Sequence, residues 1–270
     1  SKPLKWSILI ISQVFKLKQS FFEDHNLEEF NYYQFHHYRN SDFFFANYII
    51  FAESKNDVEV IKFLAKSKNI DLDLYGISLI NIDGIKNLPY PFHVVRNLNL
   101  PYTIILDKDY FIPYLNDELD SSRNSQGLPK YRFEFKNGIL LNDLIQNQLD
   151  QNKFLTFLKS NHSKALDHID KYNIICMNYN LEMDLLCSNQ AVVKMSARLN
   201  LNSVQSNRRF LLVERKKAIK NIGNILHVLD QMPIINLPNS YKRIRNKLSS
   251  IVSSIWIKSL YKHRGFLFKY

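Results

Sequence analysis

The stretch Tyr48-Ile-Ile-Phe-Ala-Glu53 is a short apolar run, partly β-branched, that ends in an acid. Its length and composition predict a buried strand. A turn follows in which Asn56 is the predicted N-cap, and the apolar stripe within residues 58–65 predicts a helix after it. A strand followed directly by a helix is the start of a βαβ unit, so this stretch decides the fold class.

Two further strands continue the pattern. They are predicted at Tyr75–Ile82 and Tyr102–Leu106, with a helix over Tyr90–Leu98 between them. Strands that alternate with helices at this spacing indicate a parallel sheet. The predicted fold class is therefore α/β, a parallel sheet flanked by helices and followed by a mainly helical C-terminal subdomain.

The pattern changes after the third strand. Residues 116–130 are polar and indicate a long loop, and Tyr131–Phe135 indicates one more strand. Beyond residue 140 the sequence is mostly helical, with segments predicted at 144–149, 154–169, 182–199, 215–229 and 241–260. We divide the chain into a lead-in of undefined role (1–45, with a helix near 12–22), an α/β domain (46–140) and a basic helical domain (141–270).

The charge is divided unevenly along the chain. Residues 1–150 hold 16 Lys and Arg against 19 Asp and Glu, a net charge of −3, whereas residues 151–270 hold 20 against 6, a net charge of +14. An acidic part joined to a basic part suits a metal-dependent enzyme that acts on a polyanion, because acids supply metal ligands and bases attract phosphates. A merely solvated basic surface explains the same charge equally well.

Other features of the composition narrow the class of protein. No apolar run approaches the roughly 20 residues of a membrane span, so we expect a soluble protein without a membrane partner. Cys176 and Cys187 are too few for a disulfide scaffold or a four-cysteine zinc site, and they suit a reducing cytoplasm. The chain begins at Ser1 and not at Met, which favours an excised or processed fragment.

Each of the three predicted strands ends at an acid. Functional groups of a parallel sheet gather at the carboxyl ends of its strands, so these side chains are expected at one edge. They are Glu53, with Asp57 one turn into the next helix, Asp83, and the pair Asp107 and Asp109. Five carboxylates in one crevice would repel each other unless cations neutralised them, and such oxygen ligands suit two Mg²⁺ or Mn²⁺ ions. Taken singly, Asp57 could only favour a helix N-terminus and Asp83 could only form a turn.

The acids and their neighbours resemble a known domain. Glu53-Ser-Lys-Asn-Asp57, Ile82-Asp-Gly84 and Leu106-Asp-Lys-Asp109 look like motifs of the TOPRIM domain of topoisomerases, bacterial primases and overcoming-lysogenization-defect (OLD) nucleases. The lead-ins Asp42–Glu53 and Leu72–Ile82 resemble the OLD nucleases more closely. The resemblance implies that the five acids named above bind two divalent metals for phosphodiester cleavage. Asp57 departs from the family's usual Glu, and the residue after Glu53 is Ser where Gly is common.

Two segments of the basic domain extend the resemblance. Asn180-Leu-Glu-Met-Asp-Leu-Leu186 looks like the family's Leu-Glu motif, which would add Glu182 to the metal site. Arg215-Lys-Lys-Ala-Ile219 looks like a weakened Lys-Pro segment, which would place Lys217, or alternatively Lys216, near the scissile phosphate. An acid at a helix N-terminus and a solvated basic helix face explain the same residues without any catalytic role.

These features together predict a metal-dependent DNA endonuclease. By resemblance it is the catalytic region of an ATPase-coupled OLD-type nuclease, with a role in phage defence. Glu53 and the other acids would hold two Mg²⁺ or Mn²⁺ ions, and Lys217 would neutralise charge in the transition state. Contacts to the DNA backbone are expected from Arg208, Arg209, Arg215, Lys216 and Lys220. An ABC-type ATPase domain or subunit and a homodimer are implied by the resemblance alone. The sequence contains no G-x4-G-K-[ST] loop, so we do not expect these 270 residues to hydrolyse ATP.

The sequence leaves other functions open. A TOPRIM scaffold without catalysis would be a nucleic-acid-binding or docking module. A receiver-type phosphoacceptor fits less well, because it needs one phosphorylated Asp and not a D-x-D ending. Topoisomerase activity is not expected, because a chain this short would have to include a separate domain with a nucleophilic tyrosine. Primase activity is not expected either, because the sequence shows no further elements that would handle a template. His25, His36 and His37 could bind a metal, although adjacent histidines among aromatic residues are more often packing or surface residues.

Overall fold

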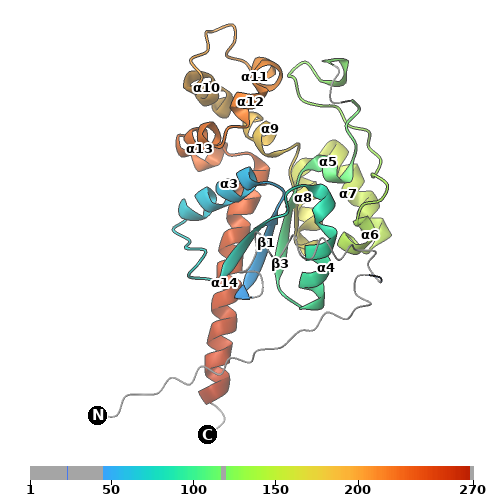
Figure 1. Cartoon of the computed structure of the whole chain (residues 1–270), viewed down its shortest axis with the longest axis vertical. Helices are drawn as coiled ribbons and strands as arrows, with labels where there is room; N and C mark the ends of the chain where they lie inside the picture. Colours follow the sequence, from blue (N-terminus) through green and yellow to red (C-terminus); the bar gives the residue numbers. More distant parts are fainter. Residues whose placement is uncertain (1–22, 24–44, 117–119, 268–270) are drawn as a thin grey trace, which may run out of the picture.

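The computed structural model describes residue 23 and residues 45–116 and 120–267 (Figure 1). At its centre is a four-stranded sheet in the order β2-β1-β3-β4, and all its strand pairs are parallel. The strands are β1 (Tyr48–Ala52), β2 (Ile77–Asn81), β3 (Tyr102–Leu106) and β4 (Ile174–Cys176). The predicted α/β class with a TOPRIM-like parallel sheet is confirmed.

The fourth strand differs from the prediction. β4 lies in the part of the chain that was expected to be helical, and it pairs with β3, where Leu106 is opposite Cys176. The mainly helical part therefore completes the sheet. The strand predicted at Tyr131–Phe135 is wrong, because Tyr131 makes only an isolated antiparallel bridge with Tyr114. That segment belongs to the long connection after β3, and the lead-in predicted at 1–45 lies almost wholly outside the described residues.

Successive residues of each strand face opposite sides of the sheet. In β1, Ile50 and Ala52 pack into one hydrophobic core, while Ile49 and Phe51 pack into the other. All five residues of β1 are buried, so both faces of the sheet must be covered. This is why the strand has a continuous apolar sequence and not an alternating one.

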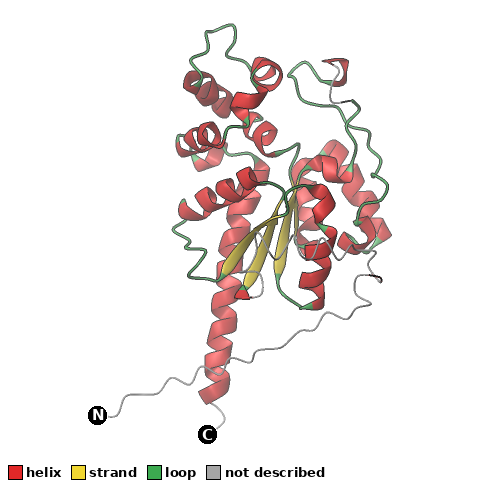
Figure 2. Ribbon diagram, viewed as in Figure 1, coloured by secondary structure: helices red, strands yellow, loops and turns green. Residues whose placement is uncertain are grey.

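Helices cover both faces of the sheet (Figures 1 and 2). On one face lie α3 (Lys55–Lys66) and α14 (Asn239–Leu267). The same hydrophobic core continues beyond the end of the sheet into α9 (Leu181–Leu186), α10 (Asn189–Arg198), α11 (Arg208–Glu214), α12 (Lys216–Ile219) and α13 (Ile222–Asp230) (Figure 1). On the other face lie α4 (Pro89–Asn97), α5 (Lys108–Phe111), α6 (Leu141–Leu144), α7 (Gln148–Ser160) and α8 (His162–Ile169). Among the described helices, including the long α14, none combines the length and apolar character needed to cross a bilayer.

Three of the helical segments predicted after residue 140 are each divided in two, whereas the segment predicted at 241–260 lies within the longer α14. The segment 154–169 is divided between α7 and α8 at Asn161, whose side chain accepts a hydrogen bond from the Lys164 N–H. The segment 215–229 is divided between α12 and α13, where Asn221 caps the second helix. Asn side chains compete for backbone groups in this way and so start new helices. The segment 182–199 is likewise two helices, α9 and α10, and the helix predicted at 144–149 is wrong because α6 ends at Leu144.

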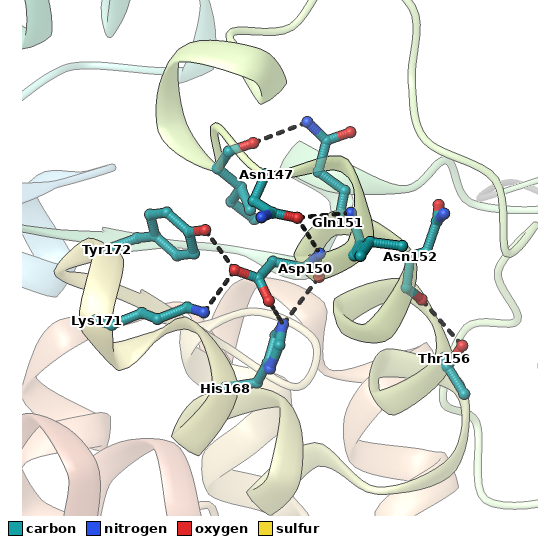
Figure 3. Close-up of polar contacts among 10 residues, drawn as sticks. Asn147, Asp150, Gln151, Asn152, Thr156, His168, Lys171 and Tyr172 are labelled. Carbon is teal, nitrogen blue, oxygen red and sulfur yellow. Dashed lines mark hydrogen bonds and ion pairs between the residues drawn. The ribbon is translucent and has the colours of Figure 1, made fainter.

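A polar cluster fastens α7 to α8 and to the short 3₁₀ helix after it (Figure 3). Asp150 accepts hydrogen bonds from Lys171 Nζ at 2.5 Å and from the Tyr172 hydroxyl at 2.6 Å. His168 Nε2 lies 2.9 Å from the backbone carbonyl of Asp150 and 3.4 Å from its carboxylate. The hydrogen bonds from Lys171 and Tyr172 hold the pKa of Asp150 below its usual value. We call these four residues the Asp150 cluster. Its carboxylate, that of Asp150, has hydrogen-bond donors within the protein.

Candidate active site

Acids from two strands meet at the carboxyl edge of the sheet. Glu53 directly follows β1, and Asp107 directly follows β3. These strands are neighbours, and the Asp107 N–H donates to Glu53 Oε2 at 3.3 Å. Asp109 lies in the single turn of α5 after β3, and its charge raises the pKa of Glu53. The parallel topology thus brings these three acids together.

Asp57 is held by the start of α3. The helix N-cap is Ser54 and not Asn56 as predicted, and Ser54 forms a reciprocal capping box with Asp57. The Ser54 N–H and hydroxyl donate to Asp57 Oδ2 at 2.8 and 2.6 Å. Asp57 is only 5% exposed, so the cap fixes a buried carboxylate one turn beyond Glu53.

Glu182 joins these acids from the helical part of the chain. It is the second residue of α9, whose N-cap Asn180 accepts a hydrogen bond from the Met183 N–H at 2.9 Å. The Glu182 side chain is 12% exposed, and its charge contributes to raising the pKa of both Asp57 and Asp107. We call Glu53, Asp57, Asp107, Asp109 and Glu182 the acid cluster.

Burial and mutual repulsion set the electrostatics of the acid cluster. Burial, followed by the charge of Asp109, raises the pKa of Glu53 to about 7. Burial also raises the pKa of Asp57 to about 6, against the lowering effect of the Ser54 hydrogen bonds. The pKa of Asp107 is raised well above its usual value by burial and then by the charge of Glu53. The cluster therefore resists carrying its full negative charge.

Asp83 lies at the same edge but is exposed. It has a φ of 55°, and the N–H of the following Gly84, with a φ of 105°, donates to the Glu53 carbonyl at 3.1 Å. This left-handed pair makes a tight turn beside the backbone of Glu53. The turn thus lies at the edge of the site. The neighbouring charges that raise the pKa values of Glu53, Asp57 and Asp107 come from the acid cluster itself.

Lys220 forms an ion pair with an acid of the cluster. Its Nζ lies 3.5 Å from Glu182 Oε1, and its carbonyl accepts a hydrogen bond from Asn56 Nδ2 at 2.8 Å. That hydrogen bond ties the residue after α12 to the start of α3. Lys216 and Lys217 are exposed on α12, and neither forms an ion pair with a described residue. The structure therefore brings a different lysine to the acids than the sequence analysis favoured.

Two of the arginines expected to bind DNA hold parts of the protein together. Arg208 Nε donates to the Leu186 carbonyl at 2.6 Å and Nη2 donates to the Cys187 carbonyl at 3.0 Å, at the C-terminus of α9. Arg209 Nη1 donates to the Asn124 carbonyl at 3.2 Å. These contacts fasten α11 to α9 and to the long connection after β3, a structural use that the sequence did not indicate.

Sequence reasoning missed a buried acid that supports the site. Asp184 is 1% exposed and accepts hydrogen bonds from the N–H groups of Asn178 and Tyr179 at 2.8 and 2.7 Å. It also accepts one from Ser240 Oγ at 2.6 Å, at the start of α14. Burial raises the pKa of Asp184 to about 6 despite these hydrogen bonds. Its place two residues after Glu182, in the first turn of a predicted helix, was the available signal.

The chemistry of the acid cluster fits a hard divalent cation. Its ligand atoms are all carboxylate oxygens, which Mg²⁺ and Mn²⁺ prefer, and a cation would relieve the repulsion that raises the pKa values. Among the residues that the structure describes, no three His, Cys, Asp or Glu side chains already lie in positions to share one ion. Binding would therefore have to draw the carboxylates together. The histidines considered in the sequence lie outside the described part of the chain.

Comparisons with known proteins give one family match and several similar solved structures. Residues 44–109 match the family described as overcoming lysogenization defect protein-like, TOPRIM domain. The C-terminal region of the Xanthomonas campestris pv. campestris OLD protein is similar at 17% identity and a TM-score of 0.51, over 82% of this chain and 100% of that chain. The C-terminal region of the Burkholderia pseudomallei OLD protein is similar at 19% identity and a TM-score of 0.45, over 77% and 98%. None of the curated proteins matches the sequence.

Proposed function

Since residues 44–109 form an OLD-like TOPRIM domain, as the sequence motifs predicted, we propose that this protein is a DNA endonuclease dependent on Mg²⁺ or Mn²⁺. The observation that carries the proposal is the acid cluster. It gathers carboxylates from two strand ends and from the helices α3, α5 and α9, and they are buried or half-buried and close enough to raise one another's pKa values. Buried groups with strongly shifted pKa values are costly to the fold and are concentrated at functional sites.

The acid cluster would hold the metal ions, with Asp83 at its rim. Divalent cations bound there would supply an activated water and stabilise the leaving oxygen of a phosphodiester. The protein's own contribution is positioning. The capping box holds Asp57, and the hydrogen bond from the Asp107 N–H to Glu53 joins the ends of β1 and β3.

We assign the cation beside the scissile phosphate to Lys220 and not to Lys217. The Lys220 side chain is 63% exposed, so an incoming phosphate can reach it, and it is 3.5 Å from Glu182 at the same time. An ammonium in this position would neutralise negative charge that develops on the phosphate during cleavage. Lys217 lies on α12 without a contact to the acid cluster, where it fits better as a DNA-backbone contact.

The exposed basic residues at the α11–α12 junction would bind the DNA backbone. Arg215, Lys216 and Lys217 are exposed there, and the Arg215 guanidinium lies 5.4 Å from the Phe210 ring. The net charge of +14 in residues 151–270 supplies affinity for a polyanion through counterion release. Backbone contacts of this kind carry no sequence information.

The wider context is part of the proposal. The similar solved structures are described as C-terminal regions of OLD proteins, which implies an N-terminal partner domain for this chain as well. We propose that this partner is an ABC-type ATPase, that the active form is a homodimer, and that the protein acts in the cytoplasm in defence against phage.

One observation favours a second candidate, a TOPRIM module that binds nucleic acid without cleaving it. Among the described residues, no three candidate ligands are yet arranged around one ion position. This second function predicts DNA binding that needs no divalent cation and no acid cluster. The two candidates therefore differ in whether Asp107 is needed: the nuclease requires it for cleavage, whereas the binding module does not require it to bind DNA.

Plasmid cleavage separates the two candidates. Supercoiled plasmid is incubated with Mg²⁺ or Mn²⁺ and with the wild type, Asp107→Ala or Glu59→Gln. Glu59 is a half-exposed acid of α3, paired with Lys62 at 2.8 Å, and serves as the matched control. We expect nicked or linear products from the wild type and from the control only. The nuclease proposal is wrong if the wild type never cleaves, or if Asp107→Ala cleaves equally well.

A further inference from the structure

A buried lysine lies between two acids of the site. Lys108 separates Asp107 from Asp109 in the sequence, yet it is only 5% exposed. Its Nζ lies 5.0, 5.5 and 5.7 Å from the ring centroids of Tyr131, Tyr179 and Phe133. No carboxylate of the described residues is within ion-pair distance of this ammonium. Three aromatic rings surround the ammonium, and the charge of the buried Asp184 also acts on it.

One of these rings belongs to a residue that is fixed by its backbone as well. The Tyr179 carbonyl accepts a hydrogen bond from the Lys108 N–H at 2.9 Å. The Tyr179 N–H donates to Asp184 Oδ1 at 2.7 Å. Lys108 thus contacts Tyr179 through both its main chain and its side chain, and it joins the end of β3 to the loop between β4 and α9.

That loop leads directly to an acid of the cluster. Asn180 follows Tyr179, and its side chain caps α9 by accepting from the Met183 N–H. Its Nδ2 also lies 3.4 Å from Glu182 Oε1. A shift of Tyr179 would therefore move Asn180, the first turn of α9 and the carboxylate of Glu182 together. The acid cluster is assembled from two distant parts of the chain, and this is a direct connection between them.

We propose that Lys108 is a positioning residue that holds Glu182 in register with Asp107 and Asp109. It acts through Tyr179, and its buried ammonium touches neither DNA nor the scissile phosphate. The catalytic consequence of this role rests on the proposed nuclease function. The structural connection between β3 and α9 does not.

Two measurements on Lys108→Met test the role. The variant keeps the unbranched stem and removes the charge. Hydrogen exchange should become at least about tenfold faster in residues 178–183 and stay unchanged in β1 and β2. The kcat for plasmid cleavage and the affinity for Mn²⁺ should each fall about tenfold, as for other residues that orient metal ligands.

A lysine that bound a phosphate would give a different result. Its loss would raise KM and reduce the slope of log affinity against log salt by about one. For Lys108→Met we expect KM and the salt slope to stay unchanged, and Lys108→Arg to restore part of the kcat. Lys130→Met is the matched control, an exposed lysine of the connection after β3, and should behave like the wild type.

A second variant keeps the test valid if Lys108→Met does not fold. Tyr179→Leu removes one ring and retains the carbonyl, and it should reproduce the faster exchange and lower kcat, with a smaller loss for Tyr179→Phe. Unchanged exchange in a wild type that cleaves DNA would overturn the positioning role and leave the nuclease proposal standing. Faster exchange in the variants, with no cleavage or Mn²⁺ binding by the wild type, would overturn the nuclease proposal alone.

Discussion

The Asp150 cluster, which contains one carboxylate, and the acid cluster, which contains five, have opposite electrostatics. In the Asp150 cluster, hydrogen bonds from Lys171 and Tyr172 hold the pKa of the carboxyl below its usual value (Figure 3). In the acid cluster, burial and neighbouring carboxylates raise the pKa of Glu53 to about 7 and that of Asp57 to about 6. The first acid stabilises the contact between two helices. The acids of the acid cluster lower the stability of the fold, and destabilising groups of this kind are concentrated at functional sites that bind a ligand.

The largest expected difference between the two groups is in catalysis. Asp57→Asn keeps an oxygen to accept the Ser54 hydrogen bonds but removes a charge from the proposed metal site. We expect plasmid cleavage to fall by more than about 100-fold, because even residues that only orient metal ligands cost about 10–100-fold. Asp150→Asn should cleave within about twofold of the wild type. Equal losses in initial rate for the two variants would contradict the distinction.

A smaller difference is expected between two lysines. Lys220→Met removes the ammonium beside Glu182, whereas Lys217→Met removes an exposed charge from α12. We expect kcat to fall by at least about tenfold in the first variant, because a cation near the reacting phosphate acts on the transition state. The second should change mainly the affinity for DNA and its salt dependence. Single-turnover cleavage at saturating enzyme checks this, and the reverse order of effects would return the role to Lys217.

Stability should change in opposite directions in the two groups. Asp107→Asn relieves the burial and repulsion of a charge, so we expect the free energy of unfolding at pH 8 to rise. The rise should appear as a higher Tm, since about 1 kcal/mol corresponds to roughly 2–4 °C for a protein of this size. Asp150→Asn removes a satisfied carboxylate and should lower Tm. Differential scanning calorimetry without divalent cations makes the comparison, and a lower Tm for Asp107→Asn would count against a strained acid cluster.

The pH dependence of stability should also have opposite signs. The folded-state pKa values of Glu53 and Asp57 are raised from 4.5 to about 7 and from 3.8 to about 6. The folded state therefore binds more protons than the unfolded state in this range, and these acids reduce stability as pH rises from about 4 to 7. Asp150 has a lowered pKa, so its contribution is present above its unfolded pKa and is lost as pH falls.

Urea unfolding of the wild type and of Asp57→Asn between about pH 4 and 7 measures the loss of stability that the raised pKa of Asp57 causes. The stability of the variant relative to the wild type should increase as pH rises from about 4 to 7 and then level off. A difference that does not depend on pH would mean that Asp57 ionises like an exposed acid.

Much of the fold could be predicted from local signals. The strands β1, β2 and β3 are apolar runs, and an acid directly follows β1 and β3, so the strand type and the positions of Glu53 and Asp107 follow from the sequence. β4 could not be recognised in the same way. Ile174–Cys176 is too short to show a pattern between helices, and it becomes a strand by pairing with β3. Pairing between distant segments is decided by tertiary structure.

The side-chain contacts at the site could not be predicted from the sequence for the same reason. Lys220 meets Glu182 because Asn56 binds the Lys220 carbonyl, a contact across most of the chain. Arg208 is a surface base in the sequence, yet it binds the carbonyls at the end of α9. Lys108 lies within an acidic motif and gives no local sign of its aromatic surroundings. Residue types in a motif predict the kind of site, whereas the partner of each side chain depends on packing.

The central claim is that the acid cluster binds divalent metal, and calorimetric titration with Mn²⁺ near pH 6.5 tests it most directly. The wild type should bind Mn²⁺ and release protons, because Glu53 and Asp57 are partly protonated there. The heat should then depend on the ionisation enthalpy of the buffer. Asp107→Asn should weaken binding by at least about tenfold, and Asp150→Asn should not. A wild type that binds no Mn²⁺, or an Asp107→Asn variant that binds it as tightly, would contradict the account.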